Sequence, residues 1–322
     1  MALGEFDLIA RYFQRPGHQL AQRVVLGIGD DCALLQPAQG QQLAVSSDIL
    51  VEGRHFFSDV DPMALGHKAL AVNLSDLAAC GASPLAFTLA LALPTADATW
   101  LGGFTKGLFA LADAHGCDLI GGDTTRGPLN ICITVFGQVP SNTALLRSGA
   151  RAGDEIWVSG TLGDARLALQ ARLGRIAVPD YALESAQQRL DWPTPRVALG
   201  QALRGLASAA IDLSDGLAGD LGHLLRASDV GATLHADAVS GLLACPWMPA
   251  SERLDHVLSG GDDYELLFTA APQEHERVLG AARQSGVAVT RIGSIEAQAG
   301  LRLTDAQGQP IKAQLSSFDH FL

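Results

Sequence analysis

The spacing of hydrophobic residues predicts alternating helices and strands in the first half of the chain. Apolar residues at helical spacing predict helices over 5–15, 62–80 and 97–115. Short runs rich in β-branched and other apolar residues are typical of strands, here at 24–28, 43–45, 87–93, 118–120 and 130–139. The last two strands flank a glycine-rich segment, 121–127, which predicts a turn.

The second half shows the same mixture of patterns. Strands are expected at 155–159, 209–213, 264–269 and 287–292, and helices after 164 and over 196–206, 217–227 and 274–285, with a less regular connector at 179–195. Glycine, proline and serine interrupt the pattern near 140–153. We therefore predict a mixed α+β fold with two domains, residues 1–145 and 146–322.

The composition limits the classes of protein to which the chain can belong. The 322 residues are 48% hydrophobic and 17% charged, enough for a large core, and the net charge is −12. An acidic chain is a poor partner for nucleic acid or for an anionic membrane. The start lacks a basic segment followed by an apolar block, and the run Phe87–Leu93 is too short to span a bilayer, so we expect a cytoplasmic protein. The five cysteines have no zinc-site spacing, and we expect reduced, buried thiols.

Aspartate is the unusual residue: the chain has 25 Asp and 9 Glu. Many lie in short Gly/Ser-rich patches at the ends of apolar runs, including Asp30-Asp31, Ser46-Ser47-Asp48, Asp76, Gly121-Gly122-Asp123, Asp212-Leu213-Ser214-Asp215 and Asp262-Asp263. Carboxylates that converge repel one another unless a hard cation lies between them, and Mg²⁺ uses one or two carboxylates together with substrate phosphates. The pattern predicts an enzyme that handles phosphates through several Mg²⁺ ions.

Each patch also has a structural interpretation. Gly and Asp are common in turns, and Ser or Asp can cap a helix, so a helix cap is an alternative for Ser214 or Asp215 and the preferred interpretation of Asp164. Only one of Asp30 and Asp31 can face a given ion, and we prefer Asp30. Along 62–80, Lys68, Asn73 and Asp76 share one side of the predicted helix, which favours a site face over a solvated face. The sequence contains no P-loop, so nucleotide must be held by other means.

The residues of these patches and their order along the chain resemble those of the bacterial thiamine-monophosphate kinase family over nearly the whole chain. The matching segments are Gly27-Ile28-Gly29-Asp30-Asp31, Val72–Ala79, Gly121–Gly127, Ile211–Leu217 and Ser259–Leu266. The resemblance implies an N-terminal domain whose sheet pairs across a homodimer to form a barrel, and a C-terminal α+β domain that completes the active site. It also implies transfer of a phosphoryl group from ATP to thiamine monophosphate, giving thiamine diphosphate.

The resemblance also implies residue roles. Asp30, Ser46, Ser47, Asp48, Asp76, Asp123, Asp212 and Asp215 would hold Mg²⁺; Gly121, Gly122, Arg147 and Ser214 would bind ATP; His55, Asp262 and Phe318 would bind thiamine monophosphate. The family usually has Glu at Asp262, one methylene longer, and often Thr at Ser47. No general base is expected, because the acceptor phosphate is already largely ionised at neutral pH.

Two other functions remain open at this stage. A related ATP-dependent enzyme could activate an amide or formyl oxygen instead of a phosphate, and a non-catalytic regulator could bind metal or nucleotide without turnover. The acceptor molecule, a phosphate monoester or a carbonyl, distinguishes the kinase from the related ATP-dependent enzyme. ATP binding without turnover would favour the non-catalytic regulator.

Overall fold

The computed structural model describes residues 5–29 and 31–311. The chain separates into two compact units: Met1–Leu77 with Ala82–Asn142, and Ala78–Gly81 with Thr143–Leu322. We call these the N-terminal unit and the C-terminal unit and describe each by itself.

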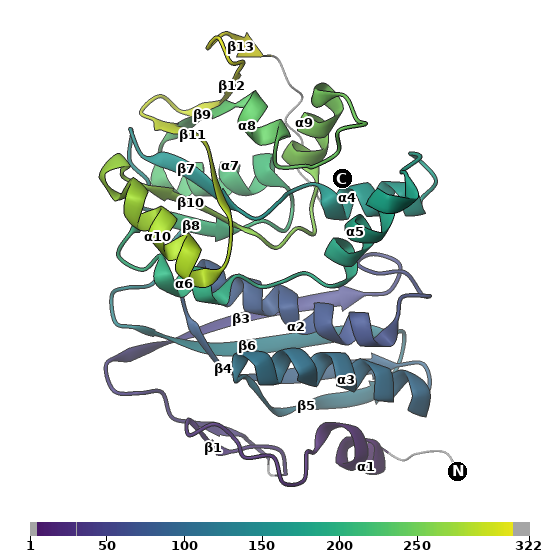
Figure 1. Cartoon of the computed structure of the whole chain (residues 1–322). Coiled ribbons are helices and arrows are strands. Elements are labelled where there is room, and N and C mark those ends of the chain that lie inside the picture. The colour runs from purple at the N-terminus through teal and green to yellow at the C-terminus, as the bar shows by residue number, and fades with distance from the viewer. Residues whose placement is uncertain (1–4, 30, 312–322) are drawn as a thin grey trace. The chain divides into compact units, whose positions relative to one another are not determined.

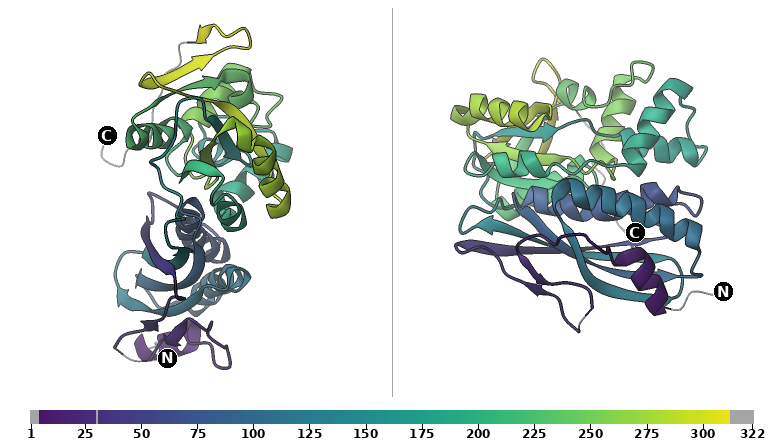
Figure 2. Two further views of the ribbon diagram at one scale, coloured as in Figure 1. Left: turned by 90° about the vertical axis from the view of Figure 1, so that its left-hand side faces the viewer. Right: turned by 60° about the horizontal axis from the view of Figure 1, so that its bottom comes forward.

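The N-terminal unit is a four-stranded sheet with two long helices on one face (Figures 1 and 2). Its elements are α1 (Glu5–Leu8), the π-helical turn η1 (Ile9–Phe13), β1 (Val24–Leu26), β2 (Leu34–Leu35), β3 (Gln41–Val51), α2 (Pro62–Ala79), β4 (Ser83–Leu93), α3 (Ala98–His115), β5 (Asp118–Arg126) and β6 (Asn130–Pro140). The strand order is β3-β6-β4-β5, so β3 and β5 form opposite edges, and β1 and β2 form a separate two-stranded ribbon.

Capping residues determine where α3 begins and ends, and glycine determines how closely α2 and α3 pack. The Asp97 carboxylate accepts the backbone N–H groups of Thr99 and Trp100, which caps α3 at its start, and Gly116 ends α3 in the left-handed conformation. Glycine allows α2 and α3 to approach closely, because a Cβ on Gly107 would lie 1.8 Å from the Met63 carbonyl oxygen. The two helices therefore pack side by side with their backbones close together.

The two faces of the sheet differ in burial. Along β3 the residues alternate, with Ser46, Asp48 and the buried Leu50 on the face covered by helices. On the other face Val45 and Ile49 are 55% and 50% exposed, and we call this face of the sheet the open face. An exposed apolar strand at a sheet edge is a feature that proteins normally cover.

The C-terminal unit is built on a seven-stranded mixed sheet. Its elements are β7 (Glu155–Ser159), α4 (Asp164–Arg172), α5 (Asp180–Asp191), α6 (Val197–Ala202), β8 (Ala207–Asp212), α7 (Leu217–Ser228), β9 (Gly231–His235), α8 (Ala236–Ser240), α9 (Ala250–Ser259), β10 (Leu266–Ala270), the 3₁₀ turn η2 (Pro272–Glu274), α10 (His275–Ser285), β11 (Val289–Glu296), β12 (Gly300–Thr304) and β13 (Pro310–Ile311). The strand order is β13-β12-β9-β11-β7-β10-β8, with only the β9–β12 pair parallel.

Successive side chains of β7 point to opposite faces of this sheet and pack on both of them. Ile156 and Val158 join a core with α4, α5, α7, α8 and α9. Trp157 points to the other face, where its ring stacks on Phe268 with centroids 6.5 Å apart and meets His275 edge-on. The fold is therefore mixed α+β in both units, as the sequence pattern predicts.

Several local predictions are wrong. The predicted turn at 121–127 is extended, because β5 continues through Arg126 and pairs with β4. The predicted connector at 179–195 contains helix α5, and the elements β9, α8, α9, β12 and β13 were not predicted. Ser46 to Asp48 lie in the middle of β3 and not at the end of a strand, since pairing with β6 carries the strand to Val51.

Candidate functional site

One group of predicted metal ligands lies between β3 and α2. The Ser46 hydroxyl donates to the Asp76 carboxylate at 2.5 Å, and the backbone N–H of Asp48 donates to the Asn73 side-chain oxygen at 3.1 Å. Asn73 and Lys68 are buried, so this side of α2 is not a solvated face. The helix and the strand are joined by the same polar residues that the sequence marks as site residues.

Ser47 and His55 occupy different surroundings. Ser47 lies on the open face, where its hydroxyl is 3.0 Å from that of Thr134. His55 follows β3 and accepts the Val51 backbone N–H on its Nδ1 atom at 3.0 Å, which fixes the neutral ring as the Nε2–H tautomer. The His55 ring is thereby oriented by the backbone of the strand that carries Asp48.

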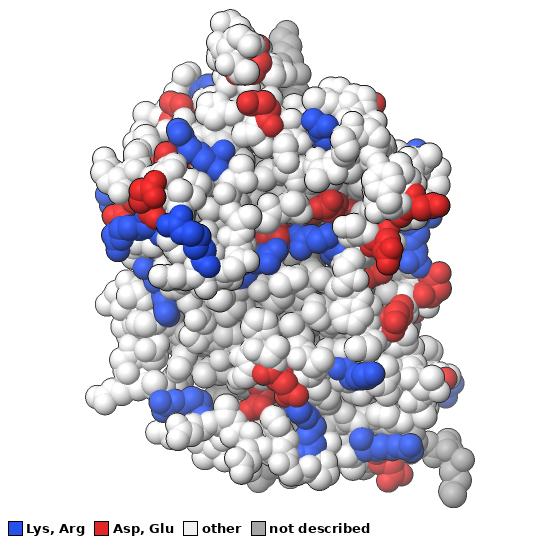
Figure 3. Space-filling view, viewed as in Figure 1, with Lys and Arg blue, Asp and Glu red and all other residues white. Residues whose placement is uncertain are grey.

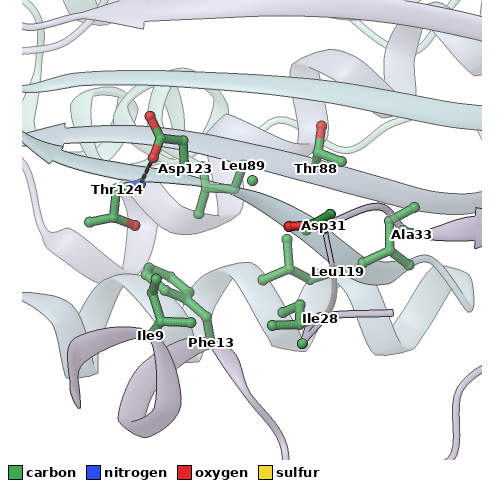
Figure 4. Close-up of a pocket in the computed structure, with 14 residues that line it drawn as sticks. Ile9, Phe13, Ile28, Asp31, Ala33, Thr88, Leu89, Leu119, Asp123 and Thr124 are labelled. Carbon is green, nitrogen blue, oxygen red and sulfur yellow. Dashed lines mark hydrogen bonds between the residues drawn. The ribbon is translucent and has the colours of Figure 1, made fainter. Parts of the chain in front are cut away.

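A second group lies on β5 beside a cavity of about 280 Å³ (Figure 4). Apolar side chains of Ile9, Phe13, Ile28 and Leu119 gather along one side of the cavity, and Asp123 and Thr124 lie at one end. The cavity is also lined by Gly29, Asp31, Ala33, Thr88, Leu89, Ile120, Gly121 and Gly122.

Gly122 must be glycine for two reasons. Its φ is 147°, and a Cβ would lie 1.9 Å from the Leu89 carbonyl oxygen on β4. The neighbouring Asp123 carboxylate accepts the backbone N–H of Thr124 at 2.9 Å. Bare backbone beside an acidic side chain allows a ligand to approach closely at this edge of the sheet.

The sheet keeps these two groups apart within one chain. Asp48 pairs with Ile133, Ile133 with Leu89, and Leu89 with Gly122. Asp48 and Gly122 thus lie in one row across four strands, a separation of about 14 Å at the usual strand spacing. Asp123 follows Gly122, so its side chain is on the opposite face from that of Asp48.

The C-terminal unit brings its predicted residues together. Asp212 ends β8, and the chain then runs through Ser214 and Asp215 into α7. The carbonyl oxygen of Ser214 accepts the backbone N–H of Asp262 at 2.9 Å, and that of Leu213 accepts the N–H of Tyr264 at 2.8 Å. Residues that are about fifty positions apart in sequence therefore share one end of the β8–β10 pair.

The backbone at Asp262 is unusual. Asp262 and Tyr264 have φ values of 66° and 50°, in the left-handed region that residues other than glycine rarely adopt. The Tyr264 hydroxyl donates to the Asp262 carboxylate at 3.3 Å. A strained backbone that is held by its surroundings is common at ligand sites.

Arg147 belongs to the same neighbourhood. Its carbonyl oxygen accepts the Ser228 hydroxyl at the end of α7, and the carbonyl oxygen of Leu146 accepts the N–H of Ala210 on β8. Burial raises the pKa of the Asp220 carboxyl to about 7; the Asp215 carboxylate also raises it, whereas the Arg147 guanidinium and two backbone N–H groups lower it. Arg147, Asp215 and Asp220 are thus close enough to interact electrostatically.

A buried ionic cluster supports this end of the sheet and was not predicted. Glu265 is fully buried and accepts hydrogen bonds from Arg189, Arg196 and the Ser159 hydroxyl. Next to it, Asp263 accepts the Gly163 backbone N–H at 2.9 Å, and burial raises the pKa of Asp263 well above its usual value. The two arginines lie in or beside the segment predicted as an irregular connector, so the sequence pattern gave no sign of the cluster.

The helix cap predicted at Asp164 is wrong, and the alternative that Ser214 or Asp215 caps α7 does not hold. Gly163 and Gly216 are the N-cap residues of α4 and α7, and neither helix has a side-chain cap. Asp164 instead accepts the Thr161 hydroxyl at 2.6 Å, and burial raises its pKa. Ser214 and Asp215 therefore lie before α7 without capping it.

The donor chemistry fits Mg²⁺. Over residues 5–29 and 31–311, no three His, Cys, Asp or Glu side chains form a group that could hold a metal ion alone. Ser46, Asp48 and Asp76 on one side of the N-terminal sheet, and Asp212 and Asp215 in the C-terminal unit, supply hard oxygen atoms with two carboxylates in each group. That number is usual for Mg²⁺ when substrate phosphates complete the coordination.

Other predictions have varied outcomes. Asp30 and Phe318 lie outside the described residues. All five cysteines are free, but only Cys117 and Cys245 are buried, and Cys32 is exposed. No helix in the described ranges has the length and apolar character needed to cross a membrane. On the face seen in Figure 3, Lys and Arg side chains stand among Asp and Glu.

Comparisons with known proteins place the chain in a family. Residues 29–139 match the N-terminal domain of AIR synthase related proteins, and residues 151–306 match the C-terminal domain. The thiamine-monophosphate kinase of Salmonella typhimurium is 48% identical over all of this chain and 99% of its own length. The crystal structure of thiamine-monophosphate kinase from Stenotrophomonas maltophilia K279a has a TM-score of 0.80 at 47% identity, covering 88% of this chain and 91% of that chain.

A further solved structure, AaThiL complexed with AMPPCP and TMP, has a TM-score of 0.74 at 28% identity and covers 89% of both chains. The sequence match extends over the whole chain, and the fold match covers most of it. The chain therefore belongs to the thiamine-monophosphate kinase family.

Proposed function

We propose that the protein phosphorylates thiamine monophosphate with ATP to give thiamine diphosphate, the last step in forming that compound. The observation that carries the proposal is the match over the full length to a thiamine-monophosphate kinase at 48% identity. The related structure complexed with AMPPCP and TMP supports the same pair of substrates.

The chemistry of the acceptor explains why no general base is required. A phosphate monoester has a second pKa of about 6, so its attacking oxygen is largely ionised at neutral pH. The remaining difficulty is to bring two polyanions together, and phosphoryl transfer depends mainly on positioning and charge stabilisation. We expect direct in-line transfer without a phosphoenzyme.

The metal-binding residues are assigned from the acid patches. Bound Mg²⁺ would neutralise phosphate charge and help to align donor and acceptor. The proposed ligands are Asp30, Ser46, Ser47, Asp48, Asp76, Asp123, Asp212 and Asp215. The polar contacts between β3 and α2 support this assignment for Ser46 and Asp76, because they orient the Asp76 carboxylate beside the strand.

The remaining residues would recognise the two substrates. Gly121 and Gly122 would allow the nucleotide to approach the backbone, Arg147 would bind phosphate through its planar guanidinium, and Ser214 would bind ATP. His55, Asp262 and Phe318 would bind thiamine monophosphate. In this scheme the N-terminal domain binds ATP and Mg²⁺, and the C-terminal domain completes the active site.

We also expect a homodimer in the cytoplasm. The open face of the N-terminal sheet carries the exposed side chains of Leu43, Val45 and Ile49. A second copy that packs its own sheet on this face would bury them and close the two sheets into a barrel. Sedimentation at micromolar concentration should give twice the chain mass, and V45D should shift the protein toward monomer.

The reaction is tested by product analysis. The protein is incubated with ATP, Mg²⁺ and thiamine monophosphate, and thiamine diphosphate is followed by chromatography. Transfer from ATP that is chiral at the γ-phosphate should invert its configuration, whereas net retention would contradict direct transfer. ATP binding without any product would contradict the kinase assignment.

A further inference from the structure

Asp220 holds the backbone of two proposed site residues. Its Oδ2 atom accepts the N–H of Ser214 at 3.1 Å and the N–H of Asp215 at 3.0 Å. Asp220 is only 3% exposed, so both hydrogen bonds are formed away from solvent. A single oxygen atom therefore satisfies two consecutive backbone donors just before α7.

This arrangement differs from ordinary helix capping. The helix begins at Leu217 after Gly216, and Asp220 already donates its own backbone N–H to the Gly216 carbonyl oxygen inside the first turn. A capping carboxylate normally stands before the helix and accepts N–H groups of the first turn. Asp220 instead stands inside the helix and reaches back to residues that precede it.

The position is costly for a carboxylate, which suggests a use beyond stability. Asp220 is buried beside the Asp215 carboxylate, and burial of a charge near a like charge is unfavourable. Gly216 has a φ of 103°, and a Cβ there would lie 3.0 Å from the carbonyl carbon of Ser259. The turn is thus packed tightly against the chain that leads to Asp262.

Two further contacts fix Ser214 from the other side. Its carbonyl oxygen accepts the Asp262 N–H, and a Cβ on Gly261 would lie 2.4 Å from that same oxygen. Over the ranges that the structure describes, the Ser214 hydroxyl and the Asp215 carboxylate form no hydrogen bond. The backbone of the turn is held, while its side chains remain available to a ligand.

We propose that Asp220 is a positioning residue, which fixes the 214–215 backbone so that the Ser214 hydroxyl and the Asp215 carboxylate face a Mg²⁺-bound nucleotide. This inference rests on the proposed function, because it takes the nucleotide as the ligand of the turn. Residues that orient ligating groups typically change metal affinity or activity by about ten- to a hundredfold when they are replaced.

The shared acceptor atom allows a sharp test. D220N keeps one oxygen that can accept both N–H groups and removes only the charge. D220L has a similar size and no acceptor. We expect D220L to speed amide hydrogen exchange at Ser214 and Asp215. We also expect it to weaken binding of Mg²⁺ with a non-hydrolysable ATP analogue by about tenfold or more. Binding of the analogue by D220N should stay within about threefold of that by the parent protein. KM for thiamine monophosphate should change little.

Asp97 provides a matched control. Its carboxylate also accepts two backbone N–H groups, those of Thr99 and Trp100, but it caps α3, which carries none of the proposed site residues. D97A should lower the melting temperature and leave analogue binding unchanged. This variant separates the loss of a doubly bonded carboxylate from an effect on the site.

The two arms of the test distinguish possible failures. If folded D220L binds the analogue as tightly as the parent protein, the positioning role is wrong. If D220L does not fold, the D220N variant decides. A tenfold weaker binding of the analogue by D220N, with amide exchange at 214–215 unchanged, would contradict a role through geometry. Retained binding of the analogue by D220N supports the positioning role. If the parent protein binds the analogue but does not phosphorylate thiamine monophosphate, the proposed function fails, and exchange and binding still decide the role of Asp220.

Discussion

Asp262 donates its backbone N–H to the carbonyl oxygen of Ser214 at 2.9 Å. This bond joins the residue proposed to bind thiamine monophosphate to one proposed to bind ATP, and it involves no side chain. Replacement of either side chain should therefore alter ligand binding while the two segments remain joined. A shared backbone contact of this kind can hold donor and acceptor sites in fixed register within the C-terminal unit.

Asp262→Asn should raise KM for thiamine monophosphate by about tenfold and change kcat little, because one charge that is proposed to contact the substrate is lost and a tenfold change in KM needs about 1.4 kcal/mol. Asparagine tolerates the left-handed backbone of this position. Asp229→Asn is the matched control, since Asp229 is also left-handed, with a φ of 54°, and ends α7. An equal rise in KM for both variants would argue against a contact between Asp262 and substrate.

Asp76→Asn should keep the fold and lower kcat by about ten- to a hundredfold, because the proposed Mg²⁺ ligand loses its charge while Ser46 can still donate to the remaining oxygen. Circular dichroism and steady-state kinetics would measure both effects. Asp113→Asn breaks a pair with Arg15 on the surface of the same unit and should leave kcat unchanged. Near-normal turnover of the Asp76 variant would remove that residue from the metal ligands.

Gly122→Ala should destabilise the protein by at least about 2 kcal/mol, since the new methyl group would overlap the Leu89 carbonyl oxygen and φ is 147°. Gly102 lies within α3 with no atom near its added Cβ, so Gly102→Ala should stabilise by about 0.5–1 kcal/mol. Urea unfolding would measure both changes. Equal stability of the Gly122 variant and the parent protein would contradict the close approach of β5 to β4.

The raised pKa of the Asp263 carboxyl should make the free energy of unfolding depend on pH. Burial raises the pKa of its carboxyl in the folded state, so as pH rises above about 4 the unfolded chain loses this proton first. Unfolding then releases a proton, and the contribution of Asp263 to the free energy of unfolding falls until pH passes the folded-state pKa. Asp263→Asn cannot titrate, and its stability relative to the parent protein should rise over this interval.

Urea unfolding of both proteins between pH 4 and 8 would measure that difference. Curves that remain parallel across the whole range would show that Asp263 does not titrate differently in the folded and unfolded states.

The fold was largely predictable where periodicity is long and clear. The helices α2 and α3 follow their predicted ranges closely because eighteen residues of apolar spacing leave little ambiguity. Strand β5 was truncated in the prediction, because glycine, threonine and aspartate over 121–127 are typical of a turn. Pairing with β4 overrides that preference, and only tertiary structure reveals it.

The candidate residues could be selected from the sequence, but how the fold arranges them could not be predicted from it. Gly/Asp patches can be recognised along the chain, yet their separation across the N-terminal sheet depends on strand order, which periodicity does not give. The cluster of Glu265 with Arg189 and Arg196 joins residues about seventy positions apart. Asp220 looks like any acid in the first turn of a helix, and only its backward hydrogen bonds distinguish it.

The proposed reaction is tested most directly by the ratio of thiamine diphosphate formed to ADP released, measured with thiamine monophosphate or with free thiamine as acceptor. We predict one thiamine diphosphate per ADP, formation that requires both Mg²⁺ and the monophosphate, and no product from free thiamine. ADP release that does not depend on the monophosphate, or folded protein that forms no thiamine diphosphate, would contradict it.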